Sequence, residues 1–395
     1  MHSLWVYEGA DLPTSPLCRQ LVIAGEARRG ADICHLVAPP PACETIWPAR
    51  QPPLLSERAQ AHVTIGPPAA AFVIGAVVSL ATSWVLVSRL ERVGERFGFS
   101  EAILGMVAAL AADAPEITAS ITALAYQQKT IGAGVVLGSN VFNLAALLGL
   151  GAVVAGRITL HRRVVVLGGT VAMAVALVCL FCVGGQLSAG IGLVVALAVL
   201  IPYVVLLGAH RAILSRLRLP VGWSTWLSTA IVEEESELEE SIHPRRGTGL
   251  DAMVAAGALV VVVLASVAME RGASSLGTHF GVPEIVVGGL VLAAVTSLPN
   301  AVSAIYLARR GRGAATLSTA LNSNSLNVTA GLLIPAIVLG LAKPSASGLL
   351  VAGWYVGVTG LTLVLAYVGR GLRRSSGGLI IAAYFLFVVV LLATS

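Results

Sequence analysis

Long apolar runs separated by short polar connections make up most of the chain after residue 68. A run of about 20 apolar residues is typical of a helix that crosses the hydrocarbon core of a bilayer. The pattern therefore predicts an all-α membrane protein with ten transmembrane helices. Their expected positions are 69–88, 102–125, 130–155, 163–184, 187–208, 250–269, 284–308, 314–341, 347–369 and 377–393.

The first 65 residues have a different character. They are rich in proline, arginine and polar residues, and they show neither a helical period nor the continuous apolar stretch of a signal peptide. We predict that residues 1–65 are disordered, or that they lie upstream of the true start of the gene.

Composition strengthens this prediction and excludes other classes of protein. Of the 395 residues, 56% are hydrophobic and 11% are charged, and the mean hydropathy is +0.87. A soluble domain carries about 25% charged residues, so a water-soluble enzyme is excluded. The net charge of +5 resides mostly in arginines of the connections, where membrane topology explains it and nucleic-acid binding does not. The preference for arginine over lysine, with abundant alanine and glycine, is typical of a bacterial genome of high GC content.

The distribution of basic residues between the connections predicts the orientation. The connections on one side contain 17 lysine and arginine residues, whereas those on the other side contain only Lys129, Arg271 and Lys343. Because basic residues are concentrated in cytoplasmic loops, we expect both termini outside and the long connection 210–249 in the cytoplasm. The expected location is the cell (inner) membrane, crossed several times.

The connection 210–249 is strongly acidic. Six glutamates lie within eight residues of it, between Glu233 and Glu240. The simpler hypothesis is a solvated cytoplasmic loop that joins two halves of the protein. The alternative is a patch that gathers cations or regulates the protein, because clustered carboxylates raise the local cation concentration.

The chain also contains an internal repeat. At an offset of 184 residues, two stretches align without a gap, each with a proline inside one apolar run and S-N-x-x-N in the next. Five spans separate the copies, so they enter the membrane in opposite directions, as the repeats of many secondary transporters do. We therefore predict two inverted-topology repeats of five helices, at 69–209 and 250–395. The aligned pairs are Gly105 with Gly289, Pro115 with Pro299, Ser139 with Ser323, Asn140 with Asn324 and Asn143 with Asn327.

Two acidic residues lie inside the broken run of the first repeat. Asp113 and Glu116 are three residues apart and share one helix face, and Pro115 between them disrupts the hydrogen-bond ladder. An ionised carboxylate near the bilayer centre costs roughly 2.5–3.5 kcal/mol, so such residues are candidates for function. The alternative is that both acids are protonated and only join helices.

Neutral oxygen donors accompany these acids in both repeats. Carboxylate, amide and hydroxyl oxygens together form a hard cage that suits Ca²⁺ or Na⁺ rather than Zn²⁺. For any single asparagine, hydrogen bonding between helices is the simpler alternative. Small residues such as Gly132, Gly134 and Gly138 are expected to let helices approach closely. The predicted donors are Asn140 and Asn143 from the first repeat and Thr296, Ser297, Asn300, Ser323, Asn324 and Asn327 from the second.

These residues resemble the two alpha repeats of the sodium/calcium exchanger family, within the cation/Ca²⁺ antiporter superfamily. The similar motifs are A-D-A-P-E at 112–116 with G-S-N-V-F-N at 138–143, and T-S-L-P-N at 296–300 with N-S-N-S-L-N at 322–327. The usual family patterns are G-T-S-x-P-E and G-S-N-x-x-N. The resemblance spans about 69–393 and indicates a bacterial member with a degenerate second alpha repeat.

The resemblance implies a ten-helix exchanger in which the acid after each proline, with nearby Thr, Ser and Asn oxygens, binds Ca²⁺ and Na⁺ alternately. Glu116 matches the first acid. The other matches are Thr296 and Ser297 with the second Thr-Ser pair, and Ser139, Asn140, Ser323 and Asn324 with the G-S-N positions.

Four positions depart from the family pattern. Asn300 replaces the second acid, Ala112 and Asp113 replace the first Thr-Ser pair, and Asn322 replaces the glycine of the second G-S-N. The chain nevertheless retains two negative charges, because both acids lie in the first repeat. Two charges balance one Ca²⁺ or two monovalent ions.

We therefore predict a secondary active antiporter that exchanges Ca²⁺ for Na⁺ by alternating access, without enzymatic activity or a cofactor. The expected partners are inorganic cations and the lipid bilayer, and no nucleic acid. A cation/proton exchanger remains an alternative, because a buried carboxyl can carry a proton. A transport-inactive sensor or scaffold is a further alternative, because the second acid is missing. An intramembrane protease is disfavoured, since Asp113 is the only aspartate in a predicted span core and no histidine lies in one.

Overall fold

The computed structural model describes residues 65–97, 101–216, 221–239, 247–311 and 313–395. Residues Thr64–Ser395 form one compact unit, and its described part is almost entirely helical, as the hydropathy pattern predicts. Of the predicted N-terminal extension, all residues except Ile65 lie outside the described part.

Six of the predicted spans correspond to single helices. These helices are α5 (Gly66–Phe97), α10 (Arg162–Val183), α11 (Ala189–Arg216), α13 (Gly249–Phe280), α19 (Ala346–Gly369) and α20 (Arg374–Thr394). All six begin within a few residues of the start of the apolar run. Three of them also end near its end, whereas α5, α11 and α13 continue well beyond it into the polar connections.

The other four predicted spans are interrupted helices. Two break at a single residue near a proline: α6 (Glu101–Ala112) and α7 (Ala114–Ala125) meet at a bend of 52°, and α15 (Ala293–Thr296) and α16 (Leu298–Arg309) at a bend of 44°. The other two contain a stretch of π-helix. Their segments are α8 (Lys129–Asn143), η1 (Leu144–Leu150) and α9 (Gly151–Ala155), and α17 (Gly313–Leu326), η3 (Asn327–Leu333) and α18 (Ile334–Leu339). Before α15, the chain forms α14 (Glu284–Val286) and η2 (Val287–Leu292).

Within the described residues, seven helices are long and apolar enough to cross a membrane, or nine if each bent pair counts as one span. The predicted span at 314–341 is helical from Gly313 to Leu339 but is not among these nine. Its first half is rich in serine, threonine and asparagine, which lowers its hydropathy. The count of ten spans therefore stays a prediction.

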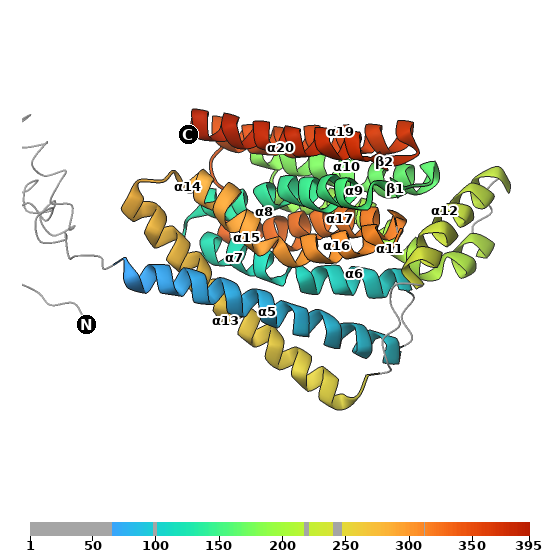
Figure 1. The fold of residues 1–395 in the computed structure, drawn as a ribbon, viewed down its shortest axis with the longest axis horizontal. Coiled ribbons are helices and arrows are strands. Elements are labelled where there is room, and N and C mark those ends of the chain that lie inside the picture. Colours follow the sequence, from blue (N-terminus) through green and yellow to red (C-terminus); the bar gives the residue numbers. More distant parts are fainter. Residues whose placement is uncertain (1–64, 98–100, 217–220, 240–246, 312) are drawn as a thin grey trace, which may run out of the picture. The chain divides into compact units, whose positions relative to one another are not determined.

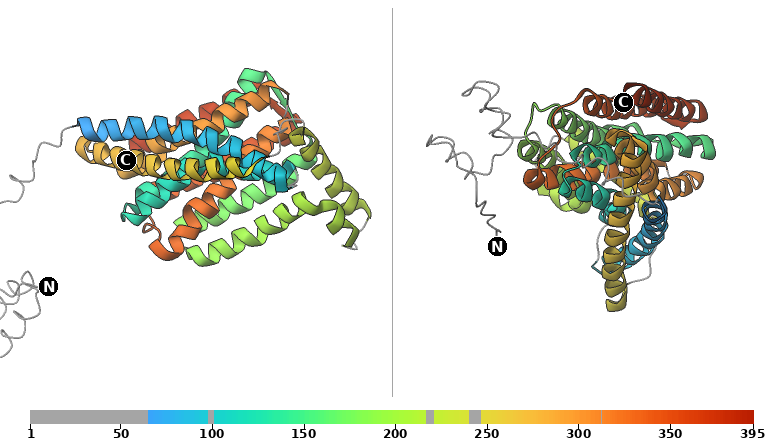
Figure 2. Two further views of the ribbon diagram at one scale, coloured as in Figure 1. Left: turned by 90° about the horizontal axis from the view of Figure 1, so that it is seen from below. Right: turned by 90° about the vertical axis from the view of Figure 1, so that its left-hand side faces the viewer.

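Helices α5 and α13 lie side by side along their length (Figures 1 and 2). A Cβ on Gly75 of α5 would lie 2.7 Å from the carbonyl oxygen of Ala265, so only glycine allows this approach. The hydroxyls of Ser79 and Ser266 are 2.7 Å apart and form a hydrogen bond across the pair. Near the start of α13, Arg89 of α5 forms an ion pair with Asp251 at 2.7 Å. These contacts join the first half of the chain to the second.

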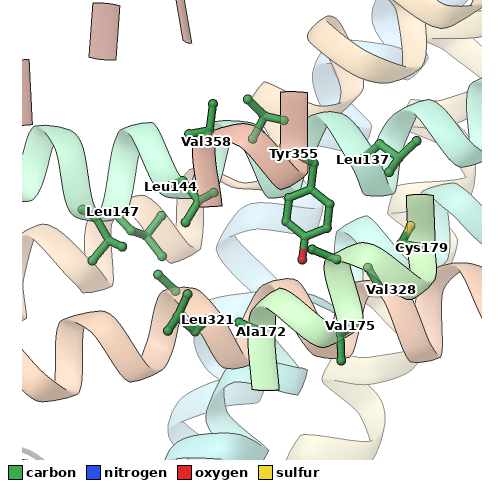
Figure 3. Packing of buried hydrophobic residues seen from close by; sticks show 14 of the residues in the cluster. Leu137, Leu144, Leu147, Ala172, Val175, Cys179, Leu321, Val328, Tyr355 and Val358 are labelled. Atoms are coloured by element: carbon green, nitrogen blue, oxygen red, sulfur yellow. The ribbon is translucent and has the colours of Figure 1, made fainter. Parts of the chain in front are cut away.

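The helix formed by α8, η1 and α9 is the most deeply buried. In its most apolar stretch 94% of the residues are buried, compared with 28% in α5 and 22% in α20. Its apolar side chains form the main hydrophobic core together with those of α10, α17 and α19. Figure 3 shows Leu137, Leu144, Val175, Leu321 and Val358 of this core. The peripheral helices expose apolar side chains, as expected of a surface in contact with lipid.

The connection 210–249 differs from the predicted loop. Helix α11 continues to Arg216, and a further helix, α12 (Val221–Glu239), occupies the middle of the connection. α12 packs against α6, α10, α11 and α17, and its residues Ala230 and Ile231 are fully buried. The connection is therefore anchored to the helical bundle, while the role of its glutamates stays a prediction.

A short antiparallel pair of strands was also missed from the sequence. β1 (Arg157–Thr159) pairs with β2 (Gly371–Arg373), with Ile158 opposite Leu372. The pair joins the connection before α10 to the connection before α20. Three-residue strands are too short to produce a recognisable alternation of polar and apolar residues.

Gly138 marks a close crossing of α8 and η2. A Cβ at this position would collide with the backbone of Gly289 in η2, which confirms that this glycine lets α8 and η2 approach closely. We expect Gly138→Ala to destabilise the protein by about 1–3 kcal/mol, because backbone atoms cannot move aside as a flexible side chain can. Thermal unfolding of the purified protein measures this, with Gly353→Ala as the matched control, since a Cβ on Gly353 meets nothing within 4 Å. Equal melting temperatures for the two variants would contradict the steric argument.

Candidate ion-binding site

Two helix breaks bring the polar residues of both repeats together in the bundle. Asp113 stands at the break between α6 and α7, and Ser297 stands at the break between α15 and α16. Pro115 has no N–H to offer the carbonyl of Ala111, and the hydroxyl of Ser83 in α5 donates to this carbonyl instead, at 3.3 Å. The proline therefore interrupts the helix without leaving a buried carbonyl unpaired.

The two carboxylates of the first repeat are held by residues of the second. Asp113 Oδ1 accepts hydrogen bonds from Asn300 Nδ2 and Ser323 Oγ, each at 2.6 Å. Glu116 Oε1 accepts one from Ser297 Oγ at 2.6 Å, and Glu116 Oε2 accepts one from the side-chain amide of Asn327. Both acids thus lie where α7 and the break before it meet residues 297–327 of the second half of the chain.

The asparagines of the two S-N-x-x-N motifs form matching contacts. Asn140 donates its side-chain amide to the backbone carbonyl of Asn324 at 3.1 Å, and Asn324 donates to the carbonyl of Asn140 at 3.0 Å. Asn143 Nδ2 donates to Asn324 Oδ1 at 3.1 Å, and Asn327 Nδ2 donates to Asn140 Oδ1 at 3.3 Å. Each contact has a counterpart between residues 184 positions away in the sequence.

Four buried oxygens in this network have no hydrogen-bond donor. They are Asp113 Oδ2, Asn143 Oδ1, Asn300 Oδ1 and Asn327 Oδ1. Among the described residues no group of three or more His, Cys, Asp or Glu could hold a metal ion. A cation bound here would therefore take most of its ligands from amide, hydroxyl and backbone oxygens, which suits a hard ion such as Ca²⁺ or Na⁺.

Two predicted ligands form hydrogen bonds with backbone carbonyls of their own helices. Thr296 Oγ1 donates to the carbonyl of Leu292 at 2.9 Å, and Ser139 Oγ donates to the carbonyl of Val136 at 3.1 Å. Both hydroxyls thus bind their own helix, as threonine and serine commonly do, and the Ser139 side chain also lies within reach of the Glu116 carboxylate. The other nine predicted residues form the hydrogen-bond network described above.

Ser120 is a polar residue of this region that the sequence did not single out. It lies one turn after Glu116 on α7, and its hydroxyl contacts the carbonyls of Gly132 in α8 and Gly331 in η3, each at 2.9 Å. Its spacing of four residues from Glu116 placed it on the same helix face and could have identified it.

The candidate site is closed to solvent in this arrangement of helices. All eleven predicted ligands are at most 1% exposed. A ligand of these residues would therefore reach them only after the surrounding helices move.

The match to known proteins decides the family. The family model described as sodium/calcium exchanger protein matches residues 68–209 and 251–393. The chain belongs to this family. It is therefore a multi-pass membrane protein of a family of ion exchangers, and the motifs at 112–116, 138–143, 296–300 and 322–327 all lie within the matched regions.

Curated relatives of this family member support the same assignment. The inner membrane protein YrbG of Escherichia coli (strain K12) is 26% identical over 252 residues, which cover 61% of this chain and 71% of the relative. The putative antiporter CaxA of Alkalimonas amylolytica is 32% identical over 84 residues, 21% of this chain and 26% of the relative. The sodium/potassium/calcium exchanger 1 of Mus musculus is 31% identical over 85 residues, 22% of this chain and 8% of the relative.

Solved structures of exchangers have the same fold as this family member. The H⁺/Ca²⁺ exchanger CAX superposes with a TM-score of 0.60 and 16% identity, over 86% of this chain and 84% of that one. The sodium–calcium exchanger NCX_Mj, soaked with zero Na⁺ and Ca²⁺, superposes with a TM-score of 0.52 and 20% identity, over 83% of this chain and all of that one.

Proposed function

We propose that this family member is a secondary active antiporter that exchanges Ca²⁺ for Na⁺ across the cell membrane by alternating access. The observation that carries the proposal is a set of four buried oxygens without a hydrogen-bond donor, three from asparagine amides and one from the Asp113 carboxylate. A buried polar atom without a partner costs about 1–3 kcal/mol. A cation that binds these oxygens removes that cost.

The charge and the ligand types favour Ca²⁺ and Na⁺ as cargo. Asp113 and Glu116 supply two negative charges, which balance one Ca²⁺ or two Na⁺ ions. Ca²⁺ takes about 6–8 oxygen ligands, and the two carboxylates with the amide oxygens of Asn143, Asn300 and Asn327 are the first candidates.

The architecture of the proposal is ten transmembrane helices in two inverted-topology repeats of five. The hydrogen bonds between Asn140 and Asn324 support it, because each asparagine donates its side-chain amide to the backbone carbonyl of the other. The same holds for a second pair of contacts. At the offset of 184 residues Asp113 corresponds to Ser297, and Glu116 corresponds to Asn300. The hydrogen bond between Asp113 and Asn300 is therefore the counterpart of the one between Ser297 and Glu116. In this topology both termini lie outside and the acidic connection lies in the cytoplasm.

The closed site explains how exchange is coupled. An empty site with two ionised carboxylates is costly to keep in a dehydrated interior, whereas a site neutralised by cations is not. Only the loaded site then passes through the occluded arrangement, so transport of one ion requires return of the other.

The test is uptake of radioactive Ca²⁺ into inside-out membrane vesicles under an imposed Na⁺ gradient or H⁺ gradient. We expect a Na⁺ gradient to drive uptake, and an ionophore that collapses the gradient to stop it. Uptake that follows only the H⁺ gradient would replace Na⁺ by a proton, the alternative favoured by the likeness to CAX. Uptake indifferent to both gradients would refute antiport. In that case thermal stabilisation of the purified protein by Ca²⁺ or Na⁺ separates a cation sensor from a scaffold that binds neither.

A further inference from the structure

Glu270 is a third acidic residue buried in the helical bundle, on a helix that supplies no residue to the ion site. It is 1% exposed, and neither oxygen of its carboxyl group has a hydrogen-bond partner. The apolar run predicted a span ending at residue 269, which left this acid in a connection. Helix α13 instead continues to Phe280, so Glu270 lies ten residues inside the helix end.

The buried serines one turn before and one turn after Glu270, Ser266 and Ser274, form hydrogen bonds with Ser79 and Gln128 and none with Glu270. Its neighbours on α13, Met269 and Ala273, pack with Ala119 and Ala123 of α7 in one hydrophobic cluster. Arg271 follows it in the chain, but its guanidinium carbon lies 4.1 Å from the ring centre of Tyr126. Among the described residues no cation forms a hydrogen bond with Glu270, although Arg271 lies near enough to attract the carboxylate.

The elements packed against α13 place few other charged residues near Glu270. Helix α5 carries its charged residues only between Arg89 and Arg96, near the opposite end of α13. Helix α7 contributes Glu116 at its start, with Tyr126 just after its end, and η2 contains no titratable residue. On α13 itself the titratable groups on this side of the membrane are Arg271 and His279.

The chemistry of a solitary carboxyl decides which ligand it takes. A metal ion requires several oxygen ligands, and among the described residues no group of three or more acidic, histidine or cysteine side chains is arranged to hold one. A proton requires a single carboxyl oxygen. An ionised carboxylate without a partner is too costly in such surroundings, and the neutral acid replaces it.

We propose that Glu270 is a proton-binding site, separate from the ion site, that is occupied while α13 packs against α5 and α7. The proton is released when these helices separate and water reaches the carboxyl. This inference does not depend on which ions the protein exchanges.

The internal repeat shows that this site belongs to one half only. The position equivalent to Glu270 in the first repeat, 184 residues earlier, is Leu86 of α5. Leu86 is 2% exposed and packs with Ala114 of α7 and Ala258 of α13 in a hydrophobic cluster of its own. The fold accepts an apolar residue at that place, so the acid at 270 is not a requirement of helix packing.

The direction of the pH effect follows from which state holds the proton. Because the packed arrangement binds one proton more than the separated arrangement, raising the pH favours separation of α13 from α7. For a single proton the equilibrium changes by at most about tenfold per pH unit.

Hydrogen–deuterium exchange of the purified full-length chain in lipid nanodiscs tests this inference without any ion gradient. Amide exchange in α13 and α7 is followed against pH and normalised to α19, which lies apart from α13 (Figure 1). We expect the normalised exchange to rise with pH in the wild type. We expect no rise in Glu270→Gln, which cannot ionise, or in Glu270→Leu, which copies the equivalent residue Leu86.

Two controls separate this response from other carboxyls. Glu284→Gln makes the same change at an exposed residue of α14 and should keep the wild-type response. The series is repeated in an Asp113→Asn/Glu116→Gln background, where the response should persist and still require Glu270. A wild type without a pH response, or a Glu270→Gln variant that retains it, would overturn the inference. Infrared spectroscopy gives a second measurement: a protonated-carboxyl C=O band that disappears in Glu270→Gln and is unaffected by Ca²⁺.

Discussion

Replacing Glu116 with glutamine is expected to abolish ion exchange and to weaken Ca²⁺ binding at least about 100-fold. Both carboxylate oxygens of Glu116 accept hydrogen bonds from the second repeat, one from Ser297 and one from Asn327. Glutamine keeps the size but removes one of the two charges, and its amide N–H₂ would face one of these donors. Removing one partner of a buried, hydrogen-bonded charge typically costs about 3–5 kcal/mol, and each 1.4 kcal/mol corresponds to a factor of ten in affinity.

The measurement is Ca²⁺ binding to the purified variant by calorimetry, together with Ca²⁺ uptake into vesicles. Glu284→Gln is the matched control, because Glu284 is exposed at the start of α14 and contributes nothing to the site. The control should bind and transport like the wild type. Retention of wild-type affinity by Glu116→Gln would show that Glu116 is not a ligand, and the resemblance to exchangers would then concern the fold alone.

Much of the fold could be predicted because hydropathy reports directly on contact with lipid. Helices α10 and α19 begin and end within about a residue of the predicted spans 163–184 and 347–369. The prediction failed where a helix continues into polar sequence. Helix α13 extends eleven residues beyond the predicted end at 269, because Ser274 and Thr278 satisfy their polar groups within the bundle or along the helix. That extension hid Glu270 from the sequence analysis.

The site could be predicted to the level of its residues but not of its contacts. Proline and the acids at 113 and 116 indicate a broken helix with charges at the break, and the structure has the break there. The sequence does not reveal that Asn140 and Asn324 exchange hydrogen bonds, because this depends on how α8 and α17 pack against each other. It also could not show that the Thr296 hydroxyl binds its own helix, because a sequence pattern does not determine the rotamer of a side chain.

Swapping the side chains at positions 113 and 300 is expected to preserve Ca²⁺ binding. Affinity for a divalent cation then depends on the number of carboxylates in the site and not on which repeat carries them. Asp113→Asn alone leaves one carboxylate, and we expect Ca²⁺ affinity to fall about 100-fold. The double variant Asp113→Asn/Asn300→Asp returns the second acid to the position where the family pattern places it. We expect it to recover affinity to within about tenfold of the wild type, measured by the same calorimetry.

The geometry explains why the exchange should be tolerated. Asn300 Nδ2 and Asp113 Oδ1 are 2.6 Å apart, so swapping the two side chains keeps one amide donor and one carboxylate acceptor in the same place. Ser323 lies within 3.3 Å of Asn300 and 2.6 Å of Asp113, and its hydroxyl can donate to a carboxylate on either side. Asn300→Asp alone provides the control, because it sets two carboxylates against each other without removing either. Repulsion between them should lower stability in the absence of a divalent cation and increase the stabilisation that Ca²⁺ produces.

The four affinities form a double-mutant cycle, and the coupling between positions 113 and 300 is its result. If the charges act together on one ion, the double variant binds far better than Asp113→Asn alone. A double variant as weak as Asp113→Asn would mean that geometry at Asp113 matters beyond its charge, so that the missing second acid is not replaced from the first repeat. Unchanged Ca²⁺ affinity in Asp113→Asn would remove Asp113 from the site and leave Glu116 as its one charged ligand.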